Sequence, residues 1–372
     1  MSADARRIQR RKFLALLAAL AGPAAAPEVA AQAFPGTPFS HALVDPAYRM
    51  SFPRDFGAHP DFRTEWWYVT GWLGEDRGFQ VTFFRVRTDH TQGNPSRFAP
   101  TQLLFAHAAL MLPQNGHALH GQRATRIGSP GVRYSELDAD VAIGDWSLSR
   151  ADDDRYRTVI RADDFEFDLT LAPPGSVGDP RNRPWLQGDE GFSRKGPRPE
   201  QASHYYSRPQ LQVSGTVDGK PATGIAWFDH EWSTTYLDPG ADGWDWTGIN
   251  LDDGSALVAF RIRPREPGPD IWRYCALRHP DGRVERFDTV EFEILRRWQS
   301  PRTSARYPVA IRLALPARSL RLEPLFDDQE LDSRGSTGTI YWEGAVRVFG
   351  DDGARLGRGY LELTGYPSPL KM

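Results

Sequence analysis

A sequence repeat constrains the fold of this chain more than any other feature. The segment WYVTGWLGEDRGFQVTFFRVR begins at Trp67, and WDWTGINLDDGSALVAFRIR begins at Trp244. Both contain W-x-x-T-G, a turn with glycine and a strand that ends in F-R-x-R, and three further matches follow in the same order. Repeated matches in one order indicate a duplicated domain. We therefore expect two similar halves, residues 34–236 and 237–372.

The runs between turn signals alternate apolar and polar residues. Val290, Phe292 and Ile294, for example, interleave with Glu291 and Glu293. Asp-Gly turn signals separate such runs, at Gly254, Gly282 and Gly353. This period of two predicts an all-β chain of antiparallel strands with one dry and one wet face. Each half can hold roughly eight or more strands and close into a barrel, which removes exposed sheet edges and can enclose one small apolar ligand.

The first 33 residues are predicted to be a signal peptide. RRKFL at residues 10–14 precedes an apolar run and the segment Ala31-Gln32-Ala33. A charged start, a short apolar core and an A-x-A site are typical of secretory signals, and the RRKFL core favours the twin-arginine route. An ordinary signal with a chance arginine pair is the alternative. We expect cleavage after Ala33 and a periplasmic or secreted protein.

Composition narrows the range of partners. The formal net charge is -3, which argues against nucleic acid. Cys275 is the single cysteine, so no intramolecular disulfide can form, and this fits export of a chain folded in the reducing cytoplasm. The sequence does not define the oligomeric state, and association with a membrane surface stays open.

Residues 226–232 read AWFDHEW and form the first candidate site. Asp229, His230 and Glu231 lie between Trp227 and Trp232. Acid-base groups among large apolar rings favour a site in which burial tunes protonation. Because successive side chains of a strand point to opposite faces, Asp229 and Glu231 should share one face and His230 the other.

Differences between the two halves point to further candidates. The first copy carries Glu65-Trp66 within TEWWYVTG, where the matched stretch of the second copy reads Asp242-Gly243. Residues 173–199 form a long Pro- and Gly-rich segment with Trp185, which predicts a lid or binding loop. We interpret residues found in one copy as functional candidates and shared residues as scaffold.

These arguments give two groups of candidate residues. The candidate catalytic side chains are Asp229, His230, Glu231 and Glu65. The candidate substrate-binding side chains are mostly aromatic: Trp66, Trp67, Tyr68, Trp227, Trp232, His204, Tyr205, Tyr206, Trp185, Trp246 and Trp342. A structural role is the alternative for several of them, above all for Trp67 as core. His107, which is in neither group, is expected to be a core or rim histidine. The arginines of the two F-R-x-R motifs are expected to pair with acids across strands.

The motifs together resemble one family. They are AWFDHEW, TEWWYVTG, SHYYS at residues 203–207, YWEG at residues 341–344 and GYLELTGY at residues 359–366. The combination resembles the tandem lipocalin-like family of carotenoid 1,2-hydratase (hydroxyneurosporene synthase) and its AttH-like secreted relatives, over essentially the whole mature chain. The resemblance implies two lipocalin-like barrels and a reaction that adds water to an isolated carbon-carbon double bond without a cofactor.

The resemblance also implies site residues. In the hydratase a histidine and a tryptophan two residues later are implicated, and His230 and Trp232 fit that spacing. A tyrosine and an aspartate on the following strand are implicated as well, but residues 260–262 read FRI here. This departure puts hydration of a carotenoid in doubt, though not the fold.

Hydration of an alkene needs an acid, shelter for a cation and an activated water. We expect Asp229 to be the acid, with Glu65 or Glu231 as alternatives, because burial among aromatic rings raises a carboxyl pKa. Trp66 and Trp232 would stabilise the cation. His230 would orient or deprotonate the water, and Tyr205 and Tyr206 would hold it.

Three other classes of function stay open from the sequence. The protein could bind a small hydrophobic ligand without catalysis, as many barrels do. His204, His230 and nearby carboxylates could bind a metal, although no H-x-H spacing supports it and we expect neither metal nor cofactor. The aromatic faces could bind glycan.

Overall fold

The computed structural model describes residues 41–89, 94, 96, 99–175 and 178–370, which belong to one compact unit, Phe39–Met372. The predicted signal peptide, residues 1–33, lies outside the described residues. In the part of the chain that is described, only three short 3-10 helices interrupt the strands: η1 (Arg54–Phe56), η2 (Pro113–Asn115) and η3 (Pro180–Asn182). None of them has the length and apolar character that a membrane span needs.

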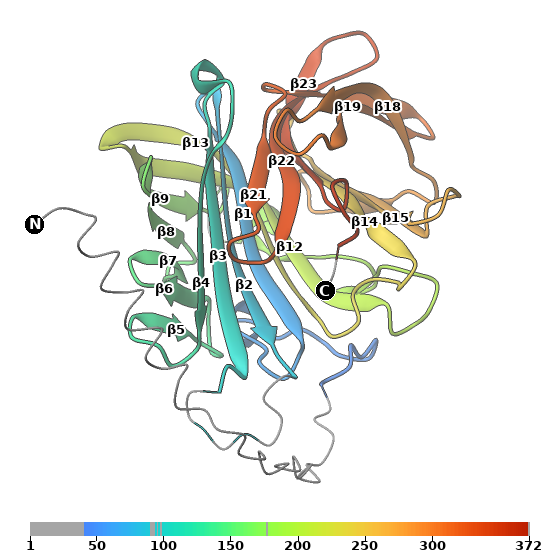
Figure 1. Ribbon diagram of the computed structural model, residues 1–372. Coiled ribbons are helices and arrows are strands. Elements are labelled where there is room, and N and C mark those ends of the chain that lie inside the picture. The colour runs from blue at the N-terminus through green and yellow to red at the C-terminus, as the bar shows by residue number, and fades with distance from the viewer. Residues whose placement is uncertain (1–40, 90–93, 95, 97–98, 176–177, 371–372) are drawn as a thin grey trace, which may run out of the picture. The chain divides into compact units, whose positions relative to one another are not determined.

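The first sheet curls into a nearly closed, lipocalin-like barrel (Figure 1). Its main path runs β4-β3-β2-β1-β13-β12-β9-β8-β7-β6-β5, and β10 and β11 pair with β12. The strands are β1 (Thr64–Leu73), β2 (Arg77–Arg87), β3 (Gln102–Met111), β4 (Leu119–Arg126), β5 (Val132–Tyr134), β6 (Asp140–Ile143), β7 (Trp146–Arg150), β8 (Tyr156–Arg161), β9 (Glu166–Ala172), β10 (Trp185–Leu186), β11 (Phe192–Arg194), β12 (Ala202–Val217) and β13 (Lys220–Ser233).

The second sheet repeats this arrangement with fewer strands. Its path is β17-β16-β15-β14-β23-β22-β20-β19-β18, with β21 beside β22. The strands are β14 (Ala241–Leu251), β15 (Ala256–Pro264), β16 (Trp272–Arg278), β17 (Val284–Arg286), β18 (Glu291–Gln299), β19 (Arg306–Leu315), β20 (Arg318–Pro324), β21 (Glu330–Ser333), β22 (Thr339–Phe349) and β23 (Arg355–Leu363). The predicted turns at Gly254, Gly282 and Gly353 have φ values of 86°, 87° and 81°, which glycine adopts without strain.

The two sheets share the order of their central strands. The run β3-β2-β1-β13-β12 of the first corresponds to β16-β15-β14-β23-β22 of the second. In both, the first strand lies between its hairpin partner and the last strand of its half. This arrangement confirms an all-β fold of two tandem lipocalin-like antiparallel barrels from an internal duplication. The segment from Ser233 to Ala241 connects the last strand of the first sheet to the first strand of the second. The domain boundary at residue 236 stays a proposal.

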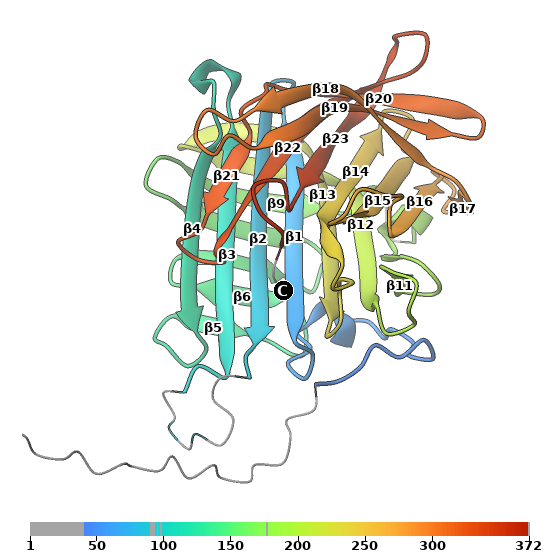
Figure 2. The same cartoon turned by 45° about the vertical axis from the view of Figure 1, so that its right-hand side comes forward.

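Three hydrophobic clusters hold the structure together. One fills the first barrel and includes Trp67 and Trp232; another fills the second and includes Trp342. The third lies between the sheets, where Trp66 and Trp246 contribute. Figures 1 and 2 show β21, β22 and β23 beside β1, β2 and β3. The interface that forms there holds the candidate site.

The described residues of the segment 173–199 do not form a lid over this interface. The segment contains η3, β10 and β11, and the two strands pair with β12. Trp185 packs edge-on against Trp227 at 6.1 Å between ring centroids. Among the residues that line the two cavities between the sheets, none comes from this segment. The segment extends the first sheet through its pairing with the long strand β12, and its Pro- and Gly-rich sequence did not indicate this pairing.

Candidate functional site between the barrels

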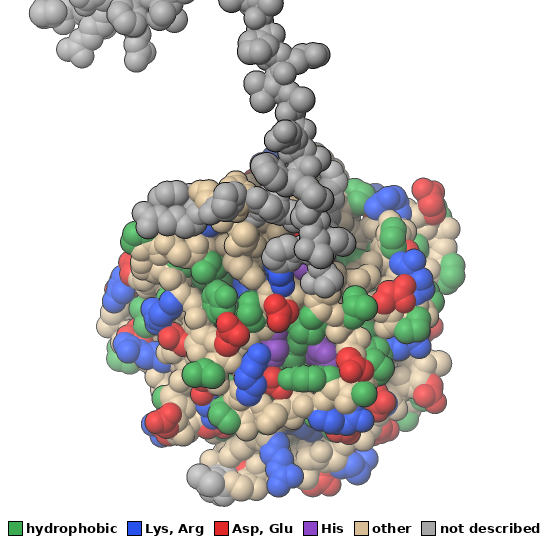
Figure 3. Space-filling model, turned by 90° about the horizontal axis from the view of Figure 1, so that it is seen from below, with side chains coloured by type: hydrophobic (Ala, Val, Ile, Leu, Met, Phe, Trp, Pro, Cys, Tyr) green, Lys and Arg blue, Asp and Glu red, His purple; other side chains and the backbone are tan. Residues whose placement is uncertain are grey.

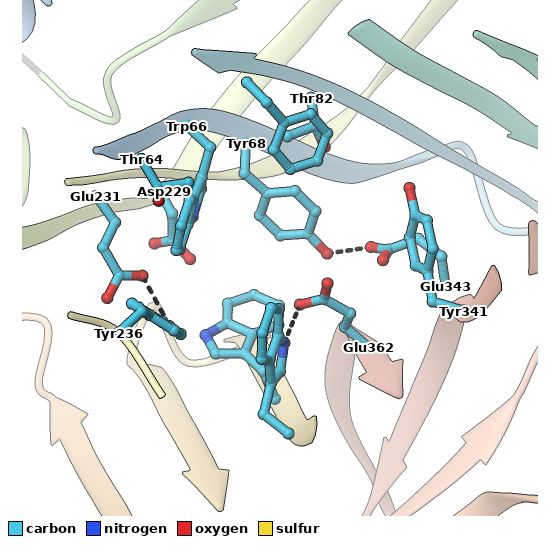
Figure 4. A pocket seen from close by; sticks show the side chains of 13 residues that line it. Thr64, Trp66, Tyr68, Thr82, Asp229, Glu231, Tyr236, Tyr341, Glu343 and Glu362 are labelled. Carbon is cyan, nitrogen blue, oxygen red and sulfur yellow. Dashed lines mark hydrogen bonds between the residues drawn. The ribbon is translucent and has the colours of Figure 1, made fainter. Parts of the chain in front are cut away.

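Two cavities lie between the sheets and share five lining residues, so we treat them as one cleft. The inner cavity has a volume of about 80 Å³, and the outer one about 470 Å³. The inner cavity is lined mainly by aromatic and acidic side chains (Figure 4): Thr64, Trp66, Tyr68, Thr82, Phe84, Asp229, Glu231, Tyr236, Trp244, Trp246, Tyr341, Glu343 and Glu362. Both sheets contribute, which answers whether this space lies inside the first barrel or between the two.

Strand alternation decides which part of AWFDHEW faces the cleft. Asp229 and Glu231 on β13 line the inner cavity, as do Trp66 and Tyr68 on β1. His230 points the other way, into the first barrel, as the period of two predicts for a continuous strand. The three adjacent acid-base residues therefore belong to two separate environments.

Asp229 has the strongest acid-base character of the residues predicted from sequence. Ser207 Oγ and Trp227 Nε1 donate to its Oδ1 at 2.5 and 2.7 Å, and Tyr205 OH donates to Oδ2 at 2.8 Å. Burial raises the pKa of Asp229 to about 7, against the lowering effect of these three donors. A carboxyl group with this pKa can give or take a proton near neutral pH.

Glu231 is held as part of a buried ion pair. Lys195 Nζ lies 2.9 Å from Glu231 Oε1, and Ser203 Oγ also donates to that oxygen. Tyr236 OH donates to Oε2 at 3.3 Å. Lys195 is almost fully buried, and burial lowers its pKa, although Glu231 opposes this. The negative charge of Glu231 also contributes to the raised pKa of Asp229.

The second barrel supplies two more carboxyl groups on the opposite side of the cavity (Figure 4). Glu343 on β22 is fully buried and accepts a hydrogen bond from Tyr68 OH. Burial raises the pKa of Glu343 well above its usual range. Burial also raises the pKa of Glu362 on β23 to about 7, although Trp244 Nε1 donates to it at 2.8 Å. The cleft thus holds three carboxyl groups, those of Asp229, Glu343 and Glu362, whose pKa values burial raises.

The two sheets face the cleft with matching rows of side chains. In the first sheet Trp66 lies between its strand neighbours Phe84 and Glu231. In the second sheet Trp246 lies between Phe260 and Glu362. The three positions are equivalent in the two strand orders, so each barrel presents a Phe-Trp-Glu row, of which Phe260 alone does not line the inner cavity.

This register corrects two sequence interpretations. Trp67 and Trp244 are matched in the W-x-x-T-G motif, but Trp67 points into the first barrel and Trp244 lines the cleft. Gly71 lies opposite Phe79 whereas Gly248 lies opposite Val258, so the second hairpin is longer. The counterpart of Glu65-Trp66 is Asp245-Trp246, and this dipeptide is shared rather than restricted to one copy.

The opposite face of β1 and β13 carries a separate charged network inside the first barrel. Glu65 Oε1 lies 2.8 Å from His59 Nδ1 and 2.9 Å from His230 Nε2, and Arg85 Nε donates to Oε2 at 2.8 Å. Asp55 Oδ1 lies 3.1 Å from His59 Nε2. We call these five residues the barrel network. Burial alone would raise the pKa of Glu65, but Arg85, His59 and His230 hold it well below its usual range.

The barrel network also contains the residues that could hold a metal. The ligand atoms of His59, Glu65 and His230 lie within 4.8 Å of one another. These atoms are already joined by hydrogen bonds, and the Arg85 guanidinium contacts the same carboxylate. A metal ion would have to replace the hydrogen bonds that join the two histidines to Glu65, and it would lie close to the positive charge of Arg85. This makes the set a poor metal site.

The other predicted aromatic residues divide between the two environments. Trp66, Tyr68, Trp227, Trp185 and Trp246 belong to the cluster between the sheets, and Tyr205 reaches it through Asp229. The remainder point into barrels. Trp67 stacks on His230 and Trp232 on His59, while Tyr206 OH contacts His230 Nδ1 at 3.2 Å. His204 packs beside Trp232, and Trp342 lies in the core of the second barrel.

Several cleft residues were missed from sequence. Glu343, Glu362, Tyr236 and Trp244 line the cleft but were not among the candidates. Lys195, which pairs with Glu231 without lining either cavity, was not among them either. A usable signal existed for Glu343, because YWEG places Tyr341 and Glu343 on the face opposite the apolar Trp342. Glu362 was discounted because it falls within a shared strand. Lys195 gave no signal, since its pairing depends on contacts between distant segments.

The outer cavity has a mixed lining. His107 Nδ1 lies 2.7 Å from Tyr341 OH, and its Nε2 lies 2.8 Å from Ser336 Oγ. Burial lowers the pKa of His107 to about 3, so the ring is neutral and serves as a rim contact between the sheets. Figure 3 shows one face of the molecule, where basic and acidic side chains are interspersed and histidine lies among hydrophobic side chains.

The sequence matches the model of one protein family, AttH-like, over residues 43–366. The chain belongs to the AttH-like family. The crystal structure of a candidate AttH from Nitrosomonas europaea aligns with 87% of this chain and 99% of its own, at 50% identity and a TM-score of 0.79. No curated protein sequence matches the chain.

Kievitone hydratase from Nectria haematococca shares the fold. Its crystal structure covers 88% of this chain and 96% of its own, with a TM-score of 0.62. The identity is 14%, so this likeness shows the fold alone. The AttH-like chain thus has two lipocalin-like barrels and a carboxyl-rich cleft between them.

Proposed function

We propose that the cleft binds an apolar, isoprenoid or lipid-like substrate and adds water to one of its carbon-carbon double bonds without a cofactor. The observation that carries this proposal is the pKa of about 7 for Asp229, a buried carboxyl group in a cavity lined by Trp and Tyr rings. Protonation of an alkene requires a group that still carries its proton near neutral pH, and burial keeps part of Asp229 protonated there.

The proposed reaction uses groups on both sides of the inner cavity. Protonated Asp229 gives its proton to one alkene carbon, and the electron pair of the double bond forms the new C–H bond. The other carbon becomes a cation, which the faces of Trp66 and Trp246 stabilise by about 0.5–2 kcal/mol each. A water oxygen then forms the C–O bond, and its extra proton passes to ionised Glu362. Exchange with solvent returns both carboxyl groups to their starting states.

Two features support a division of labour among the carboxyl groups. Glu231 forms an ion pair with Lys195, and its charge contributes to the raised pKa of Asp229. Glu362 has a pKa of about 7, so a fraction of it is ionised and can accept a proton at neutral pH. The hydratase fold of the kievitone enzyme makes water addition a reasonable chemistry to test for this family member.

Isotope incorporation tests the proposal directly. The purified protein is incubated with squalene or lycopene in water enriched in oxygen-18, and the product mass is measured. We expect one labelled hydroxyl group per product, and a loss of roughly 10²–10⁴-fold in rate for Asp229→Asn. Asp168→Asn on the distant strand β9 is the matched control. Unchanged turnover in Asp229→Asn would sink the assignment of the acid.

A carrier function is the second candidate, and the size of the outer cavity favours it. A volume of about 470 Å³ falls within the usual range of small-molecule sites, roughly 300–1,000 Å³. Mass spectrometry of the purified protein distinguishes the two functions. A stoichiometric hydrophobic ligand, recovered unchanged after long incubation, would support a carrier over an enzyme.

Export is a separate proposal that rests on sequence alone. We propose that residues 1–33 direct the folded chain through the twin-arginine route to the periplasm or the medium. Replacement of Arg10 and Arg11 by lysine should retain the unprocessed chain in the cytoplasm, as immunoblots of cell fractions would show. Export of the double variant at the normal rate would contradict this route.

A further inference from the structure

Four buried polar atoms at the interface between the sheets have no hydrogen-bond partner among the described residues. They are Thr70 Oγ1, Gln80 Oε1, Glu343 Oε2 and Tyr360 OH. All four side chains are buried. Buried polar groups in proteins are nearly always satisfied, by protein atoms or by ordered water. A group of four in one interface therefore points to a ligand that can both donate and accept.

The four atoms come from surfaces that face each other across the interface. Thr70 on β1 lies directly opposite Gln80 on β2, on the outer face of the first barrel. On the second barrel, Glu343 and Tyr360 occupy neighbouring rows of β22 and β23. Glu343 and Tyr360 also interact electrostatically, since Glu343 contributes to the raised pKa of Tyr360.

Close contacts enclose this group on two sides. On one side Tyr68 OH bonds Glu343 Oε1, and Tyr68 lies opposite Thr82, two residues from Gln80. On the other side Trp72 Nε1 donates to Gly359 O at 2.9 Å. There Gly78 approaches so closely that a Cβ would lie 2.9 Å from Tyr360 OH. Thr70 and Gln80 occupy the strand position between these two contacts.

The donor and acceptor capacities fit water. Gln80 Oε1 can only accept, whereas the hydroxyls of Thr70 and Tyr360 can donate or accept. The carboxyl of Glu343 can accept at Oε2, and it can also donate there when it is protonated. A buried water usually makes two to four hydrogen bonds of both kinds. The inner cavity, which Glu343 also lines, connects this group to the place of the proposed reaction.

We propose that Thr70, Gln80, Glu343 and Tyr360 form a buried water site at the closed end of the cleft, and that this site supplies the water added to the substrate. The supply of this water to the substrate rests on the proposed function. The water oxygen would form the C–O bond to the cation, one O–H bond would break, and that proton would pass to Glu362, which lies opposite Glu343 on the neighbouring strand. Substrate entering through the outer cavity would leave this water in place.

A pair of threonines provides a matched test that needs no substrate. Thr70 and Thr247 hold the same position in the two W-x-x-T-G motifs, and both are buried. Thr247 Oγ1 donates to Tyr360 O at 2.6 Å, whereas Thr70 Oγ1 has no protein partner. We expect both Thr70→Val and Thr247→Val to lower Tm, because each variant loses a hydrogen bond. Thr70→Val loses the bond to water, and Thr247→Val loses the bond to Tyr360 O. A crystal structure of the unaltered chain should show ordered water within hydrogen-bond distance of Thr70.

The opposite results would overturn the water site. If the site is dry, Thr70→Val removes an unsatisfied polar atom, so Tm would rise or stay unchanged while Thr247→Val still lowers it. A crystal structure that shows no water against Thr70, Gln80, Glu343 or Tyr360 would overturn the water site as well. If Thr70→Val does not fold, the Tm of Tyr360→Phe provides the same test: it falls if the site holds water and rises or stays unchanged if the site is dry.

A kinetic measurement separates the water site from the proposed function. With squalene as probe, we expect Thr70→Val and Tyr360→Phe to lower kcat at least 10-fold and to leave KM within twofold, because the substrate contacts stay in place. Ordered water and a lowered Tm without hydration of any alkene would uphold the site and overturn the proposed function. Unchanged kcat in both variants would overturn this site as the source of the water.

Discussion

Strands β1 and β13 carry acids and tryptophans on both faces, yet the two faces differ in electrostatic balance. On the barrel side, Glu65 meets Arg85 and two histidines, and its pKa is held well below its usual range. On the cleft side, Asp229 meets neutral donors and the like charge of Glu231, which itself pairs with Lys195, and burial raises the pKa of Asp229 to about 7. Similar residue types thus form an ion-paired network on one face and the candidate site on the other. Glu65 contacts a guanidinium directly, whereas the direct partners of Asp229 are neutral donors.

The largest effect that would test this comparison is on stability. Glu65→Gln leaves the buried Arg85 without its carboxylate, and loss of one partner of a buried pair costs about 3–5 kcal/mol. Asp229→Asn removes no partner of a buried cation, so its effect should stay within about 1 kcal/mol. Urea denaturation measures both. Equal losses of unfolding free energy in the two variants would show that the faces do not differ in this way.

The pH dependence of stability should have opposite signs for the two faces. Asp229 binds its proton more tightly when folded, so its contribution to stability falls as pH rises from about 4 to about 7. Glu65 binds its proton less tightly when folded, so its contribution is lost as pH falls below about 4.5. One pKa unit corresponds to about 1.4 kcal/mol, so the rise in the pKa of Asp229 from 3.8 to about 7 corresponds to about 4 kcal/mol at most.

Unfolding free energies at several pH values would measure these contributions. Asp229→Asn should reduce the loss of stability between pH 4 and 7, whereas Glu65→Gln should reduce the loss below pH 4.5. Glu343 and Glu362, whose pKa values are also raised, would keep part of the first effect in place. A steeper decline in Asp229→Asn would contradict the raised pKa.

The smallest effect concerns the second barrel. Trp244→Phe removes the indole donor to Glu362, which costs about 1 kcal/mol and raises the pKa of Glu362 further. If Glu362 accepts the proton, the pH at which activity reaches half its maximum should move up by less than about one unit. Trp67→Phe, on the barrel side, is the control and should leave the pH profile in place. A shift in the control alone would point to the wrong face.

The sequence predicted the fold and half of the site because both depend on local patterns. Alternation predicted the antiparallel strands and placed Asp229 and Glu231 on one face, and the structure has them there. The pairing of the F-R-x-R arginines with acids is confirmed, as Arg85 with Glu65 and Arg261 with Asp245 show. These outcomes need only the period of a strand and its nearest neighbours.

The rest of the site depends on register and on long-range contacts. A shift of one residue reverses the face of a side chain, so the match of Trp67 with Trp244 concealed the true pair, Trp66 and Trp246. Glu343 and Glu362 enter the cleft because the second sheet packs on the first, and no spacing in the sequence encodes that packing. The ion pair of Lys195 with Glu231 likewise joins segments far apart in the chain.

The matching Phe-Trp-Glu rows have a consequence for how such a cleft can evolve. Two identical barrels meeting across a twofold axis would be forced to carry the same acid with the same neighbours on each side. Fusion into one chain removes that constraint. Here Glu231 has a lysine partner while its counterpart Glu362 has an indole, so the two acids lie in different electrostatic surroundings. Broken symmetry lets one ancestral surface provide two different chemical roles.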